Sequence, residues 1–276
     1  MIPKIIHYCW LSGDPIPEDY QRCMDTWREK LFGYEIVLWD TNRFDIACTL
    51  WTKQAFETQL YACAADYIRL YAIYTHGGFY LDMDIEVIKS FDPLLDTDIL
   101  LAYENHISEN IEAGCFGAES GHPYIKKCIE YFEDTPLFEP SLLPEILKLK
   151  KSERHEFINP LILPEIMKNV LQESFSHDQY HIFSWDYFTA KNVVTGNIEA
   201  TENTFTIHHF ATQYHSREWR EWRKLRQKTL AVFGERCFFV RPFLGVMSFM
   251  QKTEEVGLCK TMRFYWEKYF VKRGNV

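Results

Sequence analysis

The sequence has no signal of a membrane-spanning or exported chain. No run of 18 consecutive apolar residues occurs, so we expect no transmembrane helix. The N-terminus has no long apolar segment followed by a cleavage site, so we expect no signal peptide and a cytoplasmic protein. Glycine and proline are scarce, at 12 and 11 of 276 residues, which excludes collagen-like and low-complexity chains. With 47% hydrophobic and 25% charged residues, the composition is that of a globular protein.

Cysteine patterns typical of zinc sites and disulfide scaffolds are also missing. The eight cysteines include no CxxC pair and no regular spacing. They occupy positions 9, 23, 48, 63, 115, 128, 237 and 259. We therefore expect buried free thiols rather than a metal centre or a disulfide framework.

Charge is distributed unevenly along the chain. The net charge is −9, but residues 217–276 carry +8 and residues 1–216 carry −17. This asymmetry argues against a uniformly basic nucleic-acid-binding protein. The basic end is also rich in aromatic residues, which fits attachment to an anionic membrane surface; a solvated helical face is the alternative. We expect a main domain over 1–216 and a helical segment over 217–276.

The first half of the sequence has the pattern of an α/β fold. Residues 4–10 and 34–40 are predicted strands, and 17–31 is a predicted helix between them. A second helix is expected over about 55–75, ending at Gly77-Gly78. In such a sheet the ligand crevice lies beyond the carboxyl ends of the strands. The absence of GxGxxG excludes a dinucleotide fingerprint.

An acidic pair follows directly after the next predicted strand. Asp82 and Asp84 flank Met83, and in an extended segment residues two apart project to the same side. Both carboxylates would then face one point, while Met83 turns toward the core. Mn²⁺ or Mg²⁺ typically takes one or two protein carboxylates and fills its other positions with phosphate oxygens and water. A solvated turn without a ligand is the alternative interpretation.

A second charged pair lies on the helix that precedes this strand. Asp66 and Arg69 are three residues apart and so share one helix face. Their neighbours are apolar, which favours a sheltered crevice and ligand contacts. The alternative is a surface ion pair, which contributes only about 0.3–0.5 kcal/mol.

The segment containing both pairs resembles a known family. Residues 61–95, YACAADYIRLYAIYTHGGFYLDMDIEVIKSFDPLL, are similar to the DXD sugar-binding region of glycosyltransferase family 32. They are more distantly similar to the glucosylating domains of the large clostridial toxins. IPKIIHYCWLSG near the start, HPYI at 122–125 and FTIHHF at 205–210 follow in family-like order. The resemblance implies a GT-A fold and a retaining, metal-dependent transfer from a nucleotide sugar.

The resemblance also implies a metal site. Asp84 would bind the ion, Mn²⁺ or Mg²⁺, and Asp82 would contact both the ion and the ribose or sugar. One of His208 and His209 would match a histidine near the metal and the diphosphate; a structural histidine is the alternative. Because the tryptophan that usually follows is delayed in this sequence, the choice between these two and His215 stays open.

On the donor side, Asp66 and Arg69 match residues that hold the sugar hydroxyls and the phosphate side of the donor. Trp10 matches a tryptophan that stacks on the base, with a core position as its alternative. The delayed tryptophan is Trp219, so its closing role stays open. The sequence contains nothing that decides between UDP and GDP.

Together these features predict a hexosyltransferase. Asp82, Asp84 and Arg69 are its candidate catalytic residues, because they offset the negative charge that builds up on the departing diphosphate. The predicted acceptor is a saccharide or lipid-linked saccharide in capsule or lipopolysaccharide assembly, reached from the inner membrane face. Two alternatives are a haloacid-dehalogenase-like phosphatase, which also uses DxD, and a calcium-dependent sugar-binding protein without enzymatic activity.

Overall fold

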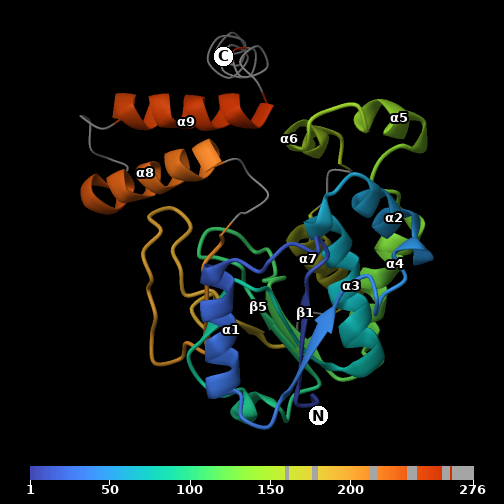
Figure 1. Ribbon diagram of the computed structural model, residues 1–276. Helices are drawn as coiled ribbons and strands as arrows, with labels where there is room; N and C mark the ends of the chain where they lie inside the picture. The colour runs from blue at the N-terminus through green and yellow to red at the C-terminus, as the bar shows by residue number, and fades with distance from the viewer. Residues whose placement is uncertain (159–161, 176–179, 212–216, 235–240, 257–261, 263–276) are drawn as a thin grey trace. The chain divides into compact units, whose positions relative to one another are not determined.

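The structure is a computed structural model that describes residues 1–158, 162–175, 180–211, 217–234, 241–256 and 262. The chain divides into two compact units (Figure 1). The first comprises Met1–Ile146, Ile158–Asn192 and Ile198–Ala211. The second comprises Leu147–Phe157, Val193–Asn197 and Thr212–Val276, so it takes in two short segments that precede the expected boundary at 216.

The first unit is built on a mixed sheet with the order β2-β1-β3-β6-β5-β7. Its strands are β1 (Ile5–Cys9), β2 (Glu35–Trp39), β3 (Gly78–Leu81), β5 (Ile99–Ala102), β6 (Cys115–Ala118) and β7 (Ile182–Phe183). The neighbours β2-β1, β1-β3 and β5-β7 are parallel, and β6 is antiparallel to β3 and β5. A separate antiparallel pair joins β4 (Ile85–Val87) to β8 (Thr206–His208). The predicted α/β class is confirmed.

Helices complete both units. Those of the first unit are α1 (Glu18–Lys30), α2 (Leu50–Glu57), α3 (Tyr61–His76), α4 (Pro123–Asp134), α5 (Leu143–Ile146) and α7 (Leu163–Ser174). Those of the second unit are α6 (Lys151–Arg154), α8 (Arg217–Phe233) and α9 (Arg241–Val256). Short 3₁₀ turns occur at Ile46–Cys48, Asp92–Leu94, Pro140–Leu142 and His155–Phe157.

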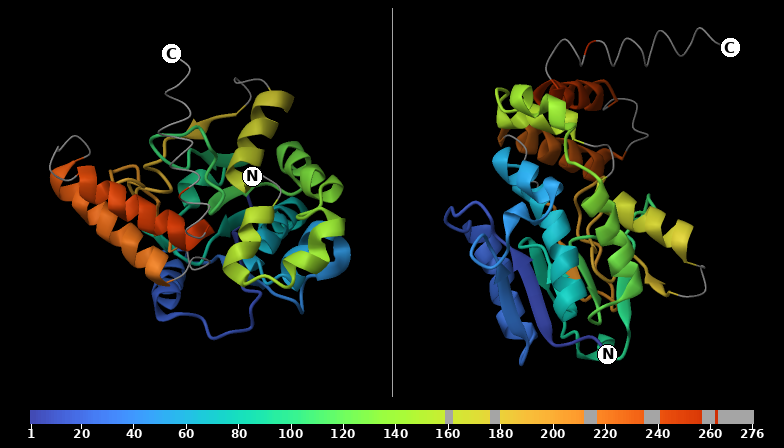
Figure 2. Two further views of the ribbon diagram at one scale, coloured as in Figure 1. Left: turned by 90° about the horizontal axis from the view of Figure 1, so that it is seen from above. Right: turned by 90° about the vertical axis from the view of Figure 1, so that its right-hand side faces the viewer.

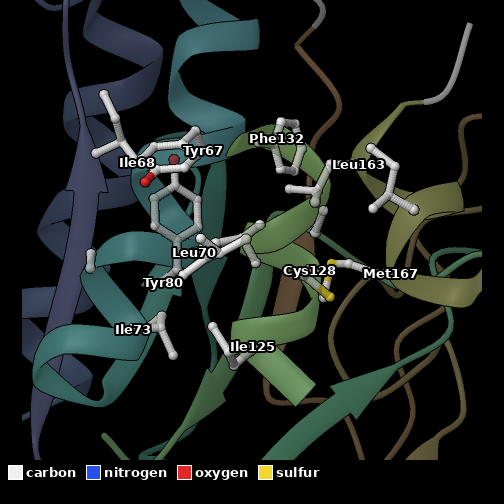
Figure 3. Packing of buried hydrophobic residues seen from close by; sticks show 14 of the residues in the cluster. Tyr67, Ile68, Leu70, Ile73, Tyr80, Ile125, Cys128, Phe132, Leu163 and Met167 are labelled. Atoms are coloured by element: carbon white, nitrogen blue, oxygen red, sulfur yellow. The ribbon is translucent and has the colours of Figure 1, made fainter. Parts of the chain in front are cut away.

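Successive side chains of β3 point into two different hydrophobic cores. Tyr80 joins a cluster with side chains of α2, α3, α4 and α7 (Figure 3). The ribbon views show these helices beside the sheet (Figure 2). Phe79 and Leu81 point the other way and pack with Trp27 of α1. The indole nitrogen of Trp27 also donates to the carbonyl oxygen of Ile85 at 2.7 Å, which fixes α1 to the start of β4. All four residues of β3 are buried, which explains why this strand has no charged residue.

Helix α3 ends at Gly77-Gly78, as predicted. Gly77 and Gly78 both have positive φ, at 67° and 102°. A Cβ on Gly78 would lie 2.5 Å from the carbonyl oxygen of Ile5, so only glycine fits there. The expected single helix over 55–75 is wrong at its start: α2 and α3 are separate, because Gln59 takes a left-handed conformation with φ 58° between them.

His7 on β1 gives the fold a dependence on pH. Its side chain is buried, Trp39 Nε1 donates to its Nδ1 at 3.0 Å, and its Nε2 lies 2.9 Å from the carbonyl oxygen of Gly77. Since Nδ1 accepts, Nε2 carries the proton and the ring is neutral. Burial lowers the pKa of His7 from 6.5 to about 4.

The unfolded chain therefore takes up a proton at His7 before the folded protein does, and stability falls as pH drops from 6.5 toward 4. We expect His7 to contribute a loss of about 2 kcal/mol in the free energy of unfolding between pH 7 and pH 5. Urea unfolding of the wild type and of His7→Gln, which lacks the titrating group, measures this difference. Equal pH dependence in the two proteins would contradict it.

Candidate metal and donor site

The acidic pair lies in a tight turn at the carboxyl end of β3. The backbone N–H of Asp82 donates to the carbonyl oxygen of Gly114 at 2.8 Å. The backbone N–H of Ile85 donates to the carbonyl oxygen of Asp82 at 3.0 Å. The turn, rather than the expected extended segment, brings the two carboxylates together. Met83 between them is buried in the core, as predicted.

A histidine from the far end of the sequence completes the group. In the β4-β8 pair, Ile85 lies opposite His208, so the ladder places this histidine beside the acidic turn. One ligand atom from each of Asp82, Asp84 and His208 lies within 4.8 Å of the others. His208 Nε2 is 3.5 Å from Asp84 Oδ1. Two carboxylates and an imidazole form a donor set that suits a divalent cation.

Gly114 leaves the space that this group needs. A Cβ at this position would lie 2.9 Å from Asp82 Oδ2, 2.8 Å from His208 Cε1 and 2.8 Å from Glu112 Oε1. All three distances are shorter than ordinary van der Waals contacts. Because Gly114 has no side chain, space remains between the candidate ligands. The residues present therefore fit a bound ion.

Charge interactions hold Asp84 and His208 together. Burial alone raises the pKa of Asp84, but the charge of His208, its hydrogen bond and the N–H of Ala211 lower that pKa to about 2. Burial alone lowers the pKa of His208, but Glu112 and Asp84 raise it well above its usual value. Asp84 is thus an anion, as a metal ligand must be.

The structure distinguishes the neighbouring histidines by their contacts. His209 Nε2 lies 2.9 Å from Glu86 Oε2, and this histidine is not part of the Asp82, Asp84 and His208 group. His208 is the last residue of β8, and His209 lies just beyond it. His215 lies outside the described residues. Trp219 belongs to α8 of the second unit, where the guanidinium of Arg223 lies 5.6 Å from the centre of its ring.

Arg69 lies behind the acidic turn and is almost fully buried. Its Nη1 donates to the carbonyl oxygen of Ala113 at 2.7 Å and to Asp82 Oδ2 at 3.3 Å, and its Nη2 is 3.2 Å from Asp66 Oδ1. The guanidinium also lies 4.5 Å from the centre of the Tyr80 ring. It therefore fixes the two aspartates relative to each other, a geometry that the helix spacing of Asp66 and Arg69 predicts only in part.

Two further candidate donor residues lie near carboxyl ends of strands. Burial raises the pKa of Asp66 to about 7, with Arg69 lowering it and Asp82 raising it. A carboxyl group of this kind can donate or accept a hydrogen bond near neutral pH. Trp10 follows β1, is partly exposed, and donates from its indole nitrogen to the carbonyl oxygen of Asp14 at 2.7 Å. Its ring also packs against the core cluster that contains Trp27, and its stacking role stays a prediction.

Sequence reasoning missed Glu112, which is buried directly behind His208. His208 Nδ1 lies 3.1 Å and 3.2 Å from the two carboxylate oxygens of Glu112. The signal was an acidic residue three positions before the apolar strand β6, where a buried charge needs a partner. Its partner is nearly 100 residues away, so no local spacing reveals it.

Comparison with known proteins places the acidic turn in a recognised region. Residues 17–101 match the family model described as "Glycosyltransferase sugar-binding region containing DXD motif". The chain is 31% identical over 134 residues to inositol phosphoceramide mannosyltransferase 3 of Schizosaccharomyces pombe, a match covering 46% of this chain and 36% of that protein. It is 26% identical to inositol phosphoceramide mannosyltransferase 1 of the same yeast, covering 70% and 68%.

Most of the curated relatives are matched over about a third to a half of their length. Among solved structures, the PaToxG glycosyltransferase matches with a TM-score of 0.43 and 17% identity, covering 63% of this chain and 70% of that one. The family match favours a glycosyltransferase over the phosphatase and the calcium-dependent sugar-binding alternatives. The resemblance found in the sequence is confirmed at this level: residues 17–101 match the DXD-containing sugar-binding region of glycosyltransferases.

Proposed function

We propose that the protein transfers a hexose from a nucleoside diphosphate sugar to a lipid-linked acceptor, with Mn²⁺ held by Asp82, Asp84 and His208. The observation that carries this proposal is the meeting of these three side chains at a turn inside the matched DXD region. The matched relatives named as mannosyltransferases support mannose as the transferred sugar. Mg²⁺ is the alternative ion, although an imidazole ligand favours the softer Mn²⁺.

The ion, when bound, acts as a Lewis acid for the departing diphosphate. The chain contributes the rest. Asp82 and Asp84 hold their charges in a fixed turn, and Arg69 keeps Asp82 from moving away from Asp66. Asp66 is available to hydrogen-bond the sugar hydroxyls, and Trp10 to stack on the base. We place no protein nucleophile in this reaction, and retention of configuration rests on the family resemblance alone.

The test is release of nucleoside diphosphate from a panel of UDP- and GDP-sugars, with Mn²⁺, Mg²⁺ or EDTA. We expect release from one donor with a metal and none in EDTA. Adding short-chain inositol phosphoceramide or a polyprenyl-linked saccharide then identifies the acceptor, and the second would fit capsule or lipopolysaccharide assembly. Full activity in EDTA would overturn the metal site, and inertness toward every donor would overturn the proposal.

A lipid-linked acceptor requires access to a membrane surface, and the second unit offers features for it. None of the described helices is both long and apolar enough to cross a bilayer. Instead, α8 carries six basic residues against two acidic ones. On α9, the exposed side chains of Phe243, Val246 and Met250 lie on one helix face. Basic and apolar surfaces together suit an interfacial helix at anionic lipid.

Co-sedimentation with liposomes tests this attachment. We expect the full chain to bind vesicles containing phosphatidylserine more than neutral vesicles, and the double variant Phe243→Ser, Val246→Ser to bind several times less. Phe32→Ser is the matched control, because Phe32 of the first unit is 89% exposed but far in sequence from the basic segment. Equal loss in both variants, or no preference for anionic vesicles, would contradict the proposal.

A further inference from the structure

Glu112 is a buried carboxylate, and both of its oxygens accept hydrogen bonds. Its side chain is 1% exposed. The backbone N–H of Gly114 donates to Oε1 at 2.6 Å, and the hydroxyl of Thr189 donates to Oε2 at 2.8 Å. These donors come from two distant parts of the chain, so the carboxylate has one fixed position. This degree of burial leaves its carboxylate inaccessible from the surface.

The position of Glu112 determines which way His208 faces. A carboxylate accepts hydrogen bonds, so His208 Nδ1, at 3.1 Å and 3.2 Å, carries a proton and donates it. The other ring nitrogen, Nε2, is thereby the one directed at Asp84. In metal sites, a histidine that donates its second N–H to a carboxylate is fixed in both tautomer and ring orientation.

The surrounding structure leaves the imidazole little freedom. The Phe210 ring stacks on it, with ring centres 3.9 Å apart and planes inclined by 19°. The backbone N–H of His208 donates to the carbonyl oxygen of Thr189 at 2.9 Å. Both Phe210 and Ala190, the residue after Thr189, have positive φ, at 48° and 47°. Backbone of this kind persists only where its surroundings impose it.

We propose that Glu112 is a positioning residue, held by Thr189 and Gly114, which presents His208 Nε2 to a divalent cation at Asp82 and Asp84. This inference rests on the proposed metal-dependent function and adds a residue to it. Glu112 acts only through the imidazole. Its removal therefore weakens binding of the ion without removing a ligand.

The same strand region provides a matched control. His209 and Glu86 form a second histidine–carboxylate pair, with 2.9 Å between Nε2 and Oε2. Both side chains are about one-third exposed, at 34% and 36%, and neither belongs to the candidate metal group. Glu86→Gln thus removes a comparable charge close to the site without affecting the orientation of His208.

The test is direct binding of Mn²⁺ to the full chain, followed by the electron paramagnetic resonance signal of the free ion. We expect Glu112→Gln to raise the Kd for Mn²⁺ by about 10- to 100-fold. Glu86→Gln should leave the Kd unchanged. Circular dichroism and the Tm in EDTA report whether each variant is folded. Unchanged Mn²⁺ affinity in folded Glu112→Gln would overturn the inference while leaving the metal site standing.

A second pair of variants covers the case in which Glu112→Gln does not fold. Thr189→Val removes the hydroxyl that holds Glu112, and Thr189→Ser keeps it. We expect weaker Mn²⁺ binding in the valine variant and recovery in the serine variant. Equal affinities in the two would overturn the inference. A wild-type protein that binds no Mn²⁺ would overturn the metal site and, with it, the role of Glu112.

Discussion

Asp84→Asn is expected to lower kcat/KM for transfer by about a thousandfold, equivalent to ~4 kcal/mol of transition-state stabilisation. The substitution keeps the shape of the side chain. Asp84 Oδ2 accepts the backbone N–H of Ala211 at 2.7 Å, and an asparagine oxygen can accept the same hydrogen bond. The substitution removes the negative charge of Asp84, which interacts with both the ion and His208. The measurement is nucleoside diphosphate release at saturating Mn²⁺.

Asp92→Asn is the control for this experiment. Asp92 is half exposed and pairs with Lys4 at 2.8 Å on the surface of the first unit. The Asp92→Asn variant should therefore keep full activity. Activity within tenfold of wild type in folded Asp84→Asn would show that the charge at this position is not needed for transfer.

Arg69→Met is expected to lower the free energy of unfolding by about 3–5 kcal/mol, because it leaves partners of a buried ion-pair network without their cation. The Arg69 side chain is 7% exposed, and it is within 3.3 Å of both Asp66 and Asp82. The carbonyl oxygen of Ala113 also loses its donor. Urea unfolding at pH 7, in the presence of EDTA, measures the loss.

Arg22→Met provides the comparison. Arg22 and Asp19 have the same i, i+3 spacing as Arg69 and Asp66, but the side chains are 63% and 74% exposed. Solvent screens such a pair, so we expect a change below about 1 kcal/mol. A similar small change in Arg69→Met would mean that the interior network contributes little to stability.

Local patterns in the sequence predict much of this unit. The first two strands, the helix between them and the end of α3 at Gly77 follow from apolar periodicity and glycine, and the structure confirms them. The position of Asp82 and Asp84 after a buried strand also follows from these patterns. This strand, β3, is short: β6 pairs with four of its residues and β1 with two.

The remaining parts of the site depend on pairings between distant segments. The choice of His208 over His209 is set by the register of β8 on β4, which no spacing within FTIHHF reveals. Glu112 is recognisable only when His208, Thr189 and Gly114 are seen around it. The break between α2 and α3 follows from one left-handed residue, Gln59, in a sequence otherwise compatible with helix. Sequence patterns show which residues are unusual, but tertiary pairing decides which of them meet.

Gly114 limits how this protein can vary. Its φ is not in the left-handed region, so positive φ is not the reason for glycine here. A larger residue would instead crowd Asp82, His208 and Glu112, each of which has an atom within 3 Å of where a methyl group would lie, and would force them to shift. A homologue that lost this glycine would have to rebuild the acidic turn, the histidine and its carboxylate together. Position 114 should therefore be among the least substitutable in the chain.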